Sequence, residues 1–153
     1  MKVALDTNVL VYAEGLNGPA KAAVARRLLG QVLADACLPV QVAAEFYNVL
    51  TLKAGVARTE AVGIVSSLTE MTTPLATTPA VLAEALELAA SARFRIFDAL
   101  ILATAASAGC ILLLSEDLQD GFVYRGTTVA NPFAETPHPL LASVLETLSG
   151  RPE

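Results

Sequence analysis

Residues 2–13 read KVALDTNVLVYA, and this segment contains the first strand and the first helix of a longer pattern. Lys2–Leu5 is a short apolar run of the kind that forms a buried strand. Thr7 and Asn8 suit a turn or a helix cap, and Val9–Ala13 predicts a short apolar helix. The segment therefore indicates a strand that leads almost directly into a helix.

The same alternation continues along the chain. Further strands are predicted at Cys37–Val40, Thr73–Leu75, Ile111–Leu114 and Thr128–Ala130. Helices are predicted at Ala20–Leu33, Gln41–Lys53, Pro79–Ala92 and Asp98–Ala108, with another that is capped by Thr59. Strands that alternate with helices are typical of a parallel sheet covered on both faces. We therefore expect an α/β protein with one core.

Composition limits the class of protein further. Hydrophobic residues make up 54% of the 153 residues and charged residues only 16%, with a mean hydropathy of +0.57. Such a chain either enters a membrane or hides extra apolar surface in its core or in a partner interface. Its longest apolar runs are too short or too interrupted for a span of ~20 residues, and Asp6 comes too early for a signal peptide. We expect a soluble, cytoplasmic protein that oligomerises and makes no membrane contact.

Four acidic residues stand in apolar or turn-forming sequence, where solvation alone would not place them. They are Asp6, Glu45, Asp98 and Asp117. Burying a lone carboxylate is costly, so buried acids are usually paired or bound to a metal. Carboxylates and waters are the ligands that Mg²⁺ and Mn²⁺ prefer, and a pair of such ions can activate water for phosphodiester hydrolysis. The four acids together suggest a shared divalent cation.

The predicted topology allows these acids to converge. Asp6 directly follows the first strand, Asp117 closely follows the Ile111–Leu114 strand, and Asp98 opens a helix. Ligands of open parallel sheets bind outside the carboxyl ends of the strands. Glu45 belongs to a polar stripe with Gln41 and Asn48 on an otherwise apolar helix, because the three are spaced i, i+4, i+7. We expect this stripe to face the site.

Each of these residues also has an ordinary structural explanation. Asp6 could begin a turn, Asp98 could be a first-turn acid favoured by the helix dipole, and Asp117 could be a loop acid. Asn8 could cap a helix, and Ser115 either caps a turn or holds a metal-bound water. Glu45 could be a buried ion-pair partner, and Glu116 is expected to face solvent. It is the combination of four acids that favours the site.

Charge and histidine content affect the function that can be expected. The net charge is −5 and the sequence pI about 4.8, which is unpromising for a nucleic-acid binder. The four acids account for four of those charges, so a bound metal would leave a nearly neutral surface. Local basic patches could then hold phosphate, although each could equally be a solvated helix face or a charge at a helix end. The candidates are Lys21 with Arg26 and Arg27, Lys53 with Arg58, and Arg93 with Arg95. The single histidine, His138, lies in a proline-rich loop, and a histidine general base is therefore not expected.

At these residues the chain resembles the PIN-domain family, in particular the VapC-like toxins of type II toxin–antitoxin pairs. The matching stretches are Leu5–Tyr12, Ala44–Leu50, Phe97–Ile101, Leu114–Gly121 and Asn131–Phe133. The resemblance implies a three-layer α/β/α fold around a central parallel sheet. Residues 1–133 would form the PIN-like nuclease domain, and residues 134–153 a C-terminal extension with a weak helix at Leu140–Leu148, packed on the domain or on a partner.

The resemblance also implies an activity and partners. The chain would be a Mg²⁺- or Mn²⁺-dependent endoribonuclease that hydrolyses RNA by metal-activated water and inhibits translation. Asp6, Glu45, Asp98 and Asp117 would be the catalytic residues, and we expect Asp6, Asp98 and Asp117 to ligate the metal. Asn8 and Ser115 would be supporting polar residues. A homodimer silenced by a cognate antitoxin is the implied assembly.

Two other functions compete with this hypothesis. A non-catalytic PIN scaffold would act only through protein or RNA binding, although such scaffolds should have lost some of the acids. An aspartyl-phosphate phosphatase would use the acid after the first strand as its nucleophile. Such phosphatases usually carry a second acid two residues later, where this chain has Asn8.

Overall fold

The computed structural model describes residues 1–150 of the chain. Its strands are β1 (Val3–Leu5), β2 (Ala36–Pro39), β3 (Thr73–Leu75), β4 (Leu112–Leu114), β5 (Val123–Tyr124) and β6 (Thr127–Ala130). Its α-helices are α1 (Thr7–Ala13), α2 (Pro19–Val32), α3 (Val40–Leu52), α4 (Arg58–Met71), α5 (Pro79–Ala92), α6 (Ile96–Ser107) and α7 (Pro139–Ser149). A single 3₁₀ turn, Leu33–Asp35, links α2 to β2.

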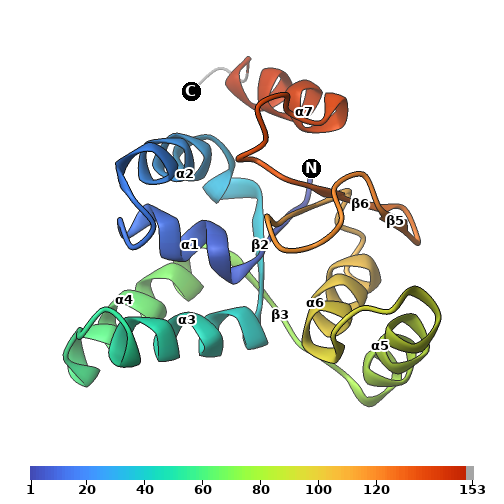
Figure 1. Cartoon of the computed structure of the whole chain (residues 1–153), viewed down its shortest axis with the longest axis horizontal. Helices are drawn as coiled ribbons and strands as arrows, with labels where there is room; N and C mark the ends of the chain where they lie inside the picture. The colour runs from blue at the N-terminus through green and yellow to red at the C-terminus, as the bar shows by residue number, and fades with distance from the viewer. Residues whose placement is uncertain (151–153) are drawn as a thin grey trace.

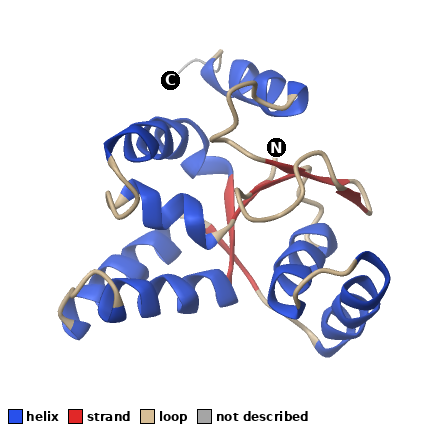
Figure 2. Ribbon diagram, in the orientation of Figure 1, coloured by secondary structure: helices blue, strands red, loops and turns tan. Residues whose placement is uncertain are grey.

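The six strands form one sheet in the order β3-β2-β1-β4-β6-β5. All neighbouring pairs are parallel except β5 with β6, which are antiparallel. Helices α1 to α4 lie on one side of the sheet, and α5 and α6 lie on the other (Figure 1). The secondary-structure view shows the short strands enclosed between these helical layers (Figure 2). The expected α/β/α arrangement around a mainly parallel sheet is therefore confirmed.

The sheet is buried because its strands are short and apolar. Every residue of β1, β2, β4 and β6 is buried, as expected for strands covered on both faces. Helix α6 lies against the sheet and buries Ala99, Ile101 and Leu102 among others, which explains why its sequence lacks a polar face. Helix α3 buries only Val42, Phe46 and Leu50, spaced i, i+4, i+8. Its other faces are free to carry polar groups.

Chain order creates a switch point between β1 and β4. From β1 the chain moves outward through β2 and β3, and it then crosses back to place β4 on the other side of β1. In open parallel sheets such a switch point is where ligands bind, outside the carboxyl ends of the strands. The Asp6 amide donates to the Leu114 carbonyl at 3.0 Å, which holds the two strand ends together.

Several predicted boundaries differ from the structure. Helix α6 begins at Ile96, two residues before the predicted start at Asp98, because the partly buried Ile96 packs against the core. Thr59 is not a helix cap, since α4 begins at Arg58 after Ala57, without a side-chain cap. The short edge strand β5 was not predicted. Its two residues, Val123 and Tyr124, are too few for a periodicity signal.

The C-terminal helix α7 packs on α2. It buries Leu141, Val144 and Leu148, which are spaced i, i+3, i+7. The helix begins with Pro139 in its first turn. The His138 ring caps it by accepting a hydrogen bond from the Leu140 amide at 3.2 Å. Within residues 1–150, no helix combines the length and apolar character needed to cross a bilayer.

Leu113 tests the role of the central strand. We expect Leu113→Ala to lower the free energy of unfolding by about 2–5 kcal/mol, since the side chain is fully buried in β4. Leu52→Ala is the matched control, because Leu52 is 79% exposed and its loss should change stability by less than about 0.5 kcal/mol. Urea unfolding followed by circular dichroism measures both. Equal effects of the two substitutions would contradict this description of the core.

Candidate active site

The site is built around Asp6, the residue at which β1 ends. Its side chain is only 4% exposed. One carboxylate oxygen, Oδ1, accepts a hydrogen bond from the Thr7 amide at 2.7 Å, so that Asp6 is the N-cap of α1. The other oxygen, Oδ2, accepts from the Ser115 hydroxyl at 2.6 Å and from Asn8 Nδ2 at 3.2 Å. The ends of β1 and β4 thus share one buried carboxylate.

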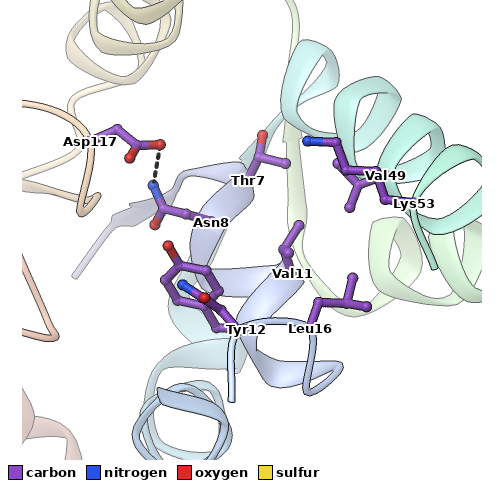
Figure 3. A pocket seen from close by; sticks show the side chains of 9 residues that line it. Thr7, Asn8, Val11, Tyr12, Leu16, Val49, Lys53 and Asp117 are labelled. Atoms are coloured by element: carbon purple, nitrogen blue, oxygen red, sulfur yellow. Dashed lines mark hydrogen bonds between the residues drawn. The ribbon is translucent and has the colours of Figure 1, made fainter.

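Asn8 connects the acids of two loops. Its Nδ2 group lies 3.2 Å from Asp6 Oδ2 and 3.2 Å from Asp117 Oδ2, and it donates to both. Its Oδ1 atom accepts the Glu116 amide at 3.3 Å. Figure 3 shows Asn8 reaching toward Asp117 from α1. A single amide side chain therefore holds Asp6 and Asp117 close to each other.

Ser115 shapes the loop after β4. Its hydroxyl donates to Asp6 and accepts the amides of Asp117, at 3.2 Å, and Leu118, at 3.3 Å. Of the two roles considered for Ser115, the structure therefore contains the turn cap. The cap turns the chain sharply after the strand and projects the exposed Asp117 side chain over the strand ends.

Glu45 is held from α3. One of its oxygens accepts the Thr7 hydroxyl at 2.8 Å, and the other accepts Gln41 Nε2 at 2.9 Å. The predicted stripe is thus confirmed for Gln41 and Glu45. Asn48 is exposed and instead lines a separate hollow between α3 and α4. Gln41 Oε1 is buried and accepts no hydrogen bond within residues 1–150.

The charges of neighbouring acids affect both Asp6 and Asp98. Burial raises the pKa of Asp6 to about 6, even though the hydrogen bonds from Ser115 and Thr7 lower it, and the charges of Asp117 and Asp98 raise it further. The pKa of Asp98 is also raised, mainly by burial. The charge of Arg95 opposes this rise, and the charges of Asp117 and Glu45 add to it. Asp98 lies in the first turn of α6. The acids therefore repel one another across a shared space.

The carboxylates do not form a complete metal cage by themselves. Among residues 1–150, no three histidine, cysteine or acidic side chains are arranged so that they could hold one metal ion. Mg²⁺ commonly binds through only one or two carboxylates and keeps several waters. The donor set fits such a hydrated cation: Asp6 and Asp117 bracket Asn8, Asp98 lies nearby, and Gln41 Oε1 is free to accept from a water.

Two hollows open on either side of Asp117. One, of about 420 Å³, lies between α1 and α3, with Val11, Tyr12 and Val49 among its walls and Lys53 at its rim (Figure 3). The second, also of about 420 Å³, is lined by Arg93, Phe94, Arg95, Asp98 and Asp117. Both hollows are lined in part by Asp117, so they lie next to each other beside the acids, and we call them the two arms of the site groove.

Sequence comparison identifies the family. The model of the PIN domain family matches residues 3–122. The chain belongs to the PIN domain family. No curated protein matches it with significance.

Solved structures with the same fold include a toxin–antitoxin complex and a toxin. A toxin–antitoxin complex from Klebsiella pneumoniae superposes on this PIN domain with a TM-score of 0.65 and 17% identity, over 86% of this chain and 98% of the other. VapC20 of Mycobacterium tuberculosis, described as a toxin that cleaves the sarcin–ricin loop, gives 0.62 and 18%, over 76% and 92%. DNA-bound VapBC of Salmonella typhimurium gives 0.63 and 17%, over 84% and 96%. At these identities the likeness shows the fold.

The structure adds site residues that sequence reasoning did not find. Glu116 was expected to face solvent, but it is half-buried and accepts hydrogen bonds from the Tyr12 hydroxyl and the Lys21 ammonium. Burial opposes its ionisation, but the Lys21 and Tyr12 hydrogen bonds outweigh it and lower the pKa of Glu116. The backbone amide of Glu116 donates to the Asn8 side chain, and the Glu116 carboxylate binds Tyr12 on α1 and Lys21 on α2. In this PIN domain these contacts therefore help to hold Asn8 in place. Sequence spacing predicts contacts only between residues three or four apart on one helix, so it could not reveal the contact of Lys21 with Glu116, which are 95 residues apart.

Asp6 gives the PIN domain a characteristic pH dependence. Its pKa is about 6 when folded and 3.8 in a model peptide, so the folded state binds the proton more tightly. Stability from this group is therefore present below about pH 4 and is lost as pH rises through 6. Two pKa units correspond to roughly 3 kcal/mol.

We expect metal-free wild-type protein to lose stability between pH 4 and 7 relative to Asp6→Asn. For each protein, the free energy of unfolding at pH 7 is subtracted from that at pH 4. The pH-independent contribution of hydrogen bonds lost in Asp6→Asn then cancels. Urea unfolding in EDTA measures it. Parallel pH profiles for the two proteins would contradict the raised pKa.

Proposed function

We propose that this PIN domain is a Mg²⁺- or Mn²⁺-dependent endoribonuclease, with Asp6, Glu45, Asp98 and Asp117 as its catalytic residues. The observation that carries the proposal is the buried carboxylate of Asp6 at the switch point, within electrostatic range of Asp98 and Asp117. The charges of Asp117 and Asp98 raise the pKa of Asp6, so the ionised carboxylates repel one another. A divalent cation relieves their repulsion, which gives the arrangement a chemical purpose.

Asp6, Asp98 and Asp117 are the residues that would hold the cation, and Asn8 and Ser115 keep two of them in place. When bound, the cation supplies an activated water and stabilises the charge on the leaving oxygen. Glu45 orients the attacking water and takes its proton. Both of its oxygens accept a hydrogen bond, from Thr7 and Gln41, which fixes the carboxylate while each oxygen retains a second lone pair.

We further propose that the chain is a cytoplasmic toxin of a toxin–antitoxin pair, which inhibits translation by cutting RNA and is silenced by a cognate antitoxin. Support comes from the solved structures of like fold, one of which is described as a toxin–antitoxin complex and another as a toxin that cleaves the sarcin–ricin loop. A homodimer is part of this proposal. Exposed apolar side chains on α5, Leu82 and Leu86, and Phe97 on α6 provide surface for a second chain. Residues 134–153 act as an extension of the nuclease domain, which ends near residue 133.

The alternative function is a non-catalytic PIN scaffold that acts through protein or RNA binding. One observation favours it: no group of three acids among residues 1–150 is arranged to hold a metal. The presence of all four acids and the organised hydrogen bonds around Asp6 favour the nuclease. The two functions differ in cleavage and in metal binding, and each of these can be measured separately.

Cleavage is tested with labelled total cellular RNA and protein freed of any co-purifying inhibitor. We expect discrete fragments with Mg²⁺ or Mn²⁺ and none with EDTA. Asp98→Asn should lower the rate on the order of 100-fold or more, because even residues that only orient a ligand commonly contribute 10–100-fold. Glu60→Gln is the matched control, since it removes one charge from an exposed position on α4. Equal rates for Asp98→Asn and wild type would contradict the assignment.

Metal binding is tested without any activity assay. At a Mn²⁺ concentration about 100-fold above Kd, binding to the folded state adds about 2.7 kcal/mol of stability, which raises the melting midpoint. We expect this rise for wild type and for Glu60→Gln at neutral pH, and its loss in Asp6→Asn and Asp98→Asn. A rise that persists in both Asp variants, or that is absent from wild type, would favour the scaffold.

A further inference from the structure

Arg93 has a backbone conformation that arginine rarely adopts. Among residues 1–150, only two residues other than glycine have a positive φ, namely Arg93 at 58° and Arg125 at 46°. Left-handed backbone is unfavourable for a residue with a Cβ, and a helix end of this kind usually carries glycine or asparagine. Arg93 is the C-cap of α5. An arginine at this position is therefore expected to make a side-chain interaction that offsets the unfavourable backbone.

Arg125 provides the comparison, because its side chain makes such an interaction within the fold. Its guanidinium pairs with Glu84 at 2.6 Å and lies 5.5 Å from the centre of the Tyr124 ring. Arg93, by contrast, makes no hydrogen bond, ion pair or ring contact with any of residues 1–150. It is exposed and lines the hollow that contains Asp98 and Asp117. The Arg93 side chain therefore has no structural partner within residues 1–150 and is available to a ligand in this hollow.

The turn that carries Arg93 is fixed rather than loose. Phe94, the next residue, packs edge-on against Phe122 with ring centres 4.9 Å apart and an interplanar angle of 86°. Arg95 follows as the N-cap of α6 and lines the same hollow. It lowers the pKa of Asp98 through its charge, without forming an ion pair with it in the described chain. Two guanidinium groups thus flank an anchored phenylalanine beside the acids.

The chemistry of this arm of the groove suits a phosphate. Guanidinium groups bind phosphate oxygens through paired hydrogen bonds, and they do so more specifically than an ammonium. The arm joins the acids at Asp117, so an anion held there is the neighbour of whatever is bound at the acids. Neither arginine forms an ion pair within residues 1–150, so both guanidinium groups are available to an anionic ligand at this point.

We propose that Arg93 and Arg95 form a subsite for a backbone phosphate of single-stranded RNA, adjacent to the phosphate that is cut. The subsite rests on the ribonuclease function proposed above. It gives the bound strand a direction through the groove, with a phosphate on the α5–α6 side of the acids. Arg93 and Arg95 are substrate-binding residues and take no part in bond breaking.

The salt dependence of RNA binding tests the subsite. The probe is a labelled single-stranded RNA oligonucleotide of mixed sequence, titrated in EDTA over a series of salt concentrations. Each phosphate contact to a single strand contributes about 0.7 to the slope of log K against log salt. We expect the double variant Arg93→Asn/Arg95→Gln to bind more weakly and to reduce the magnitude of this slope by about 0.7. In the cleavage assay it should raise KM and leave kcat nearly unchanged.

Arg125→Asn is the matched control, because it makes the same change at the other left-handed arginine and should leave the slope unchanged. Asparagine tolerates left-handed backbone, so Arg93→Asn should keep or raise the melting midpoint. A lower midpoint with an unchanged slope would assign Arg93 to the fold and overturn the subsite. An unchanged slope in the double variant would also overturn it, leaving the two arginines as a contact for an acidic protein segment and the nuclease function intact. Failure of wild type to bind RNA at any salt would overturn the subsite, whereas the nuclease function is decided separately by the cleavage assay with Mg²⁺ or Mn²⁺.

Discussion

The burial of one carboxylate, Asp6, is the constraint on which the rest of the site depends. A charge so poorly solvated requires compensation, and three donors supply it: the Thr7 amide and Asn8 Nδ2 in the first turn of α1, and the Ser115 hydroxyl in the loop after β4. Those donors tie the end of β1 to the end of β4 and fix the turn that carries Asp117. The same hydrogen bonds that make the burial of Asp6 tolerable therefore also assemble the site, while burial, and to a smaller extent the charges of Asp117 and Asp98, raises the pKa of Asp6.

Much of the fold was predictable because its signals are local. The apolar strands at Val3–Leu5 and Leu112–Leu114 and the helix Pro79–Ala92 follow from short-range composition and punctuation. The convergence of Asp6 and Asp117 followed from one general rule about the carboxyl ends of parallel strands. The edge strand β5 was missed because its pairing with β6 is set by a tight turn at Arg125 and Gly126, not by a repeating pattern.

The parts of the site that escaped prediction are those made by contacts between distant segments. The sequence around Glu116 is typical of a solvent-facing loop acid. Glu116 gains a structural role only because Tyr12 on α1 and Lys21 on α2 approach it. Thr7 looked like a helix cap, yet its hydroxyl binds Glu45 on another helix. Arg93 gave no sign in the sequence of its left-handed backbone, because backbone conformation at a helix end depends on where the next helix must start.

The hydrogen bond between Tyr12 and Glu116 has an optical consequence. The chain has no tryptophan and only three tyrosines, so its intrinsic fluorescence comes from tyrosine alone. A phenol that donates to a carboxylate is quenched, because the excited ring transfers its proton to that acceptor. Tyr12 also lines the hollow beside Asn8 and Asp117, whereas Tyr47 and Tyr124 lie elsewhere. Movement of the Glu116 loop when the groove is filled would thus change the emission of an unlabelled protein, and the site carries its own reporter.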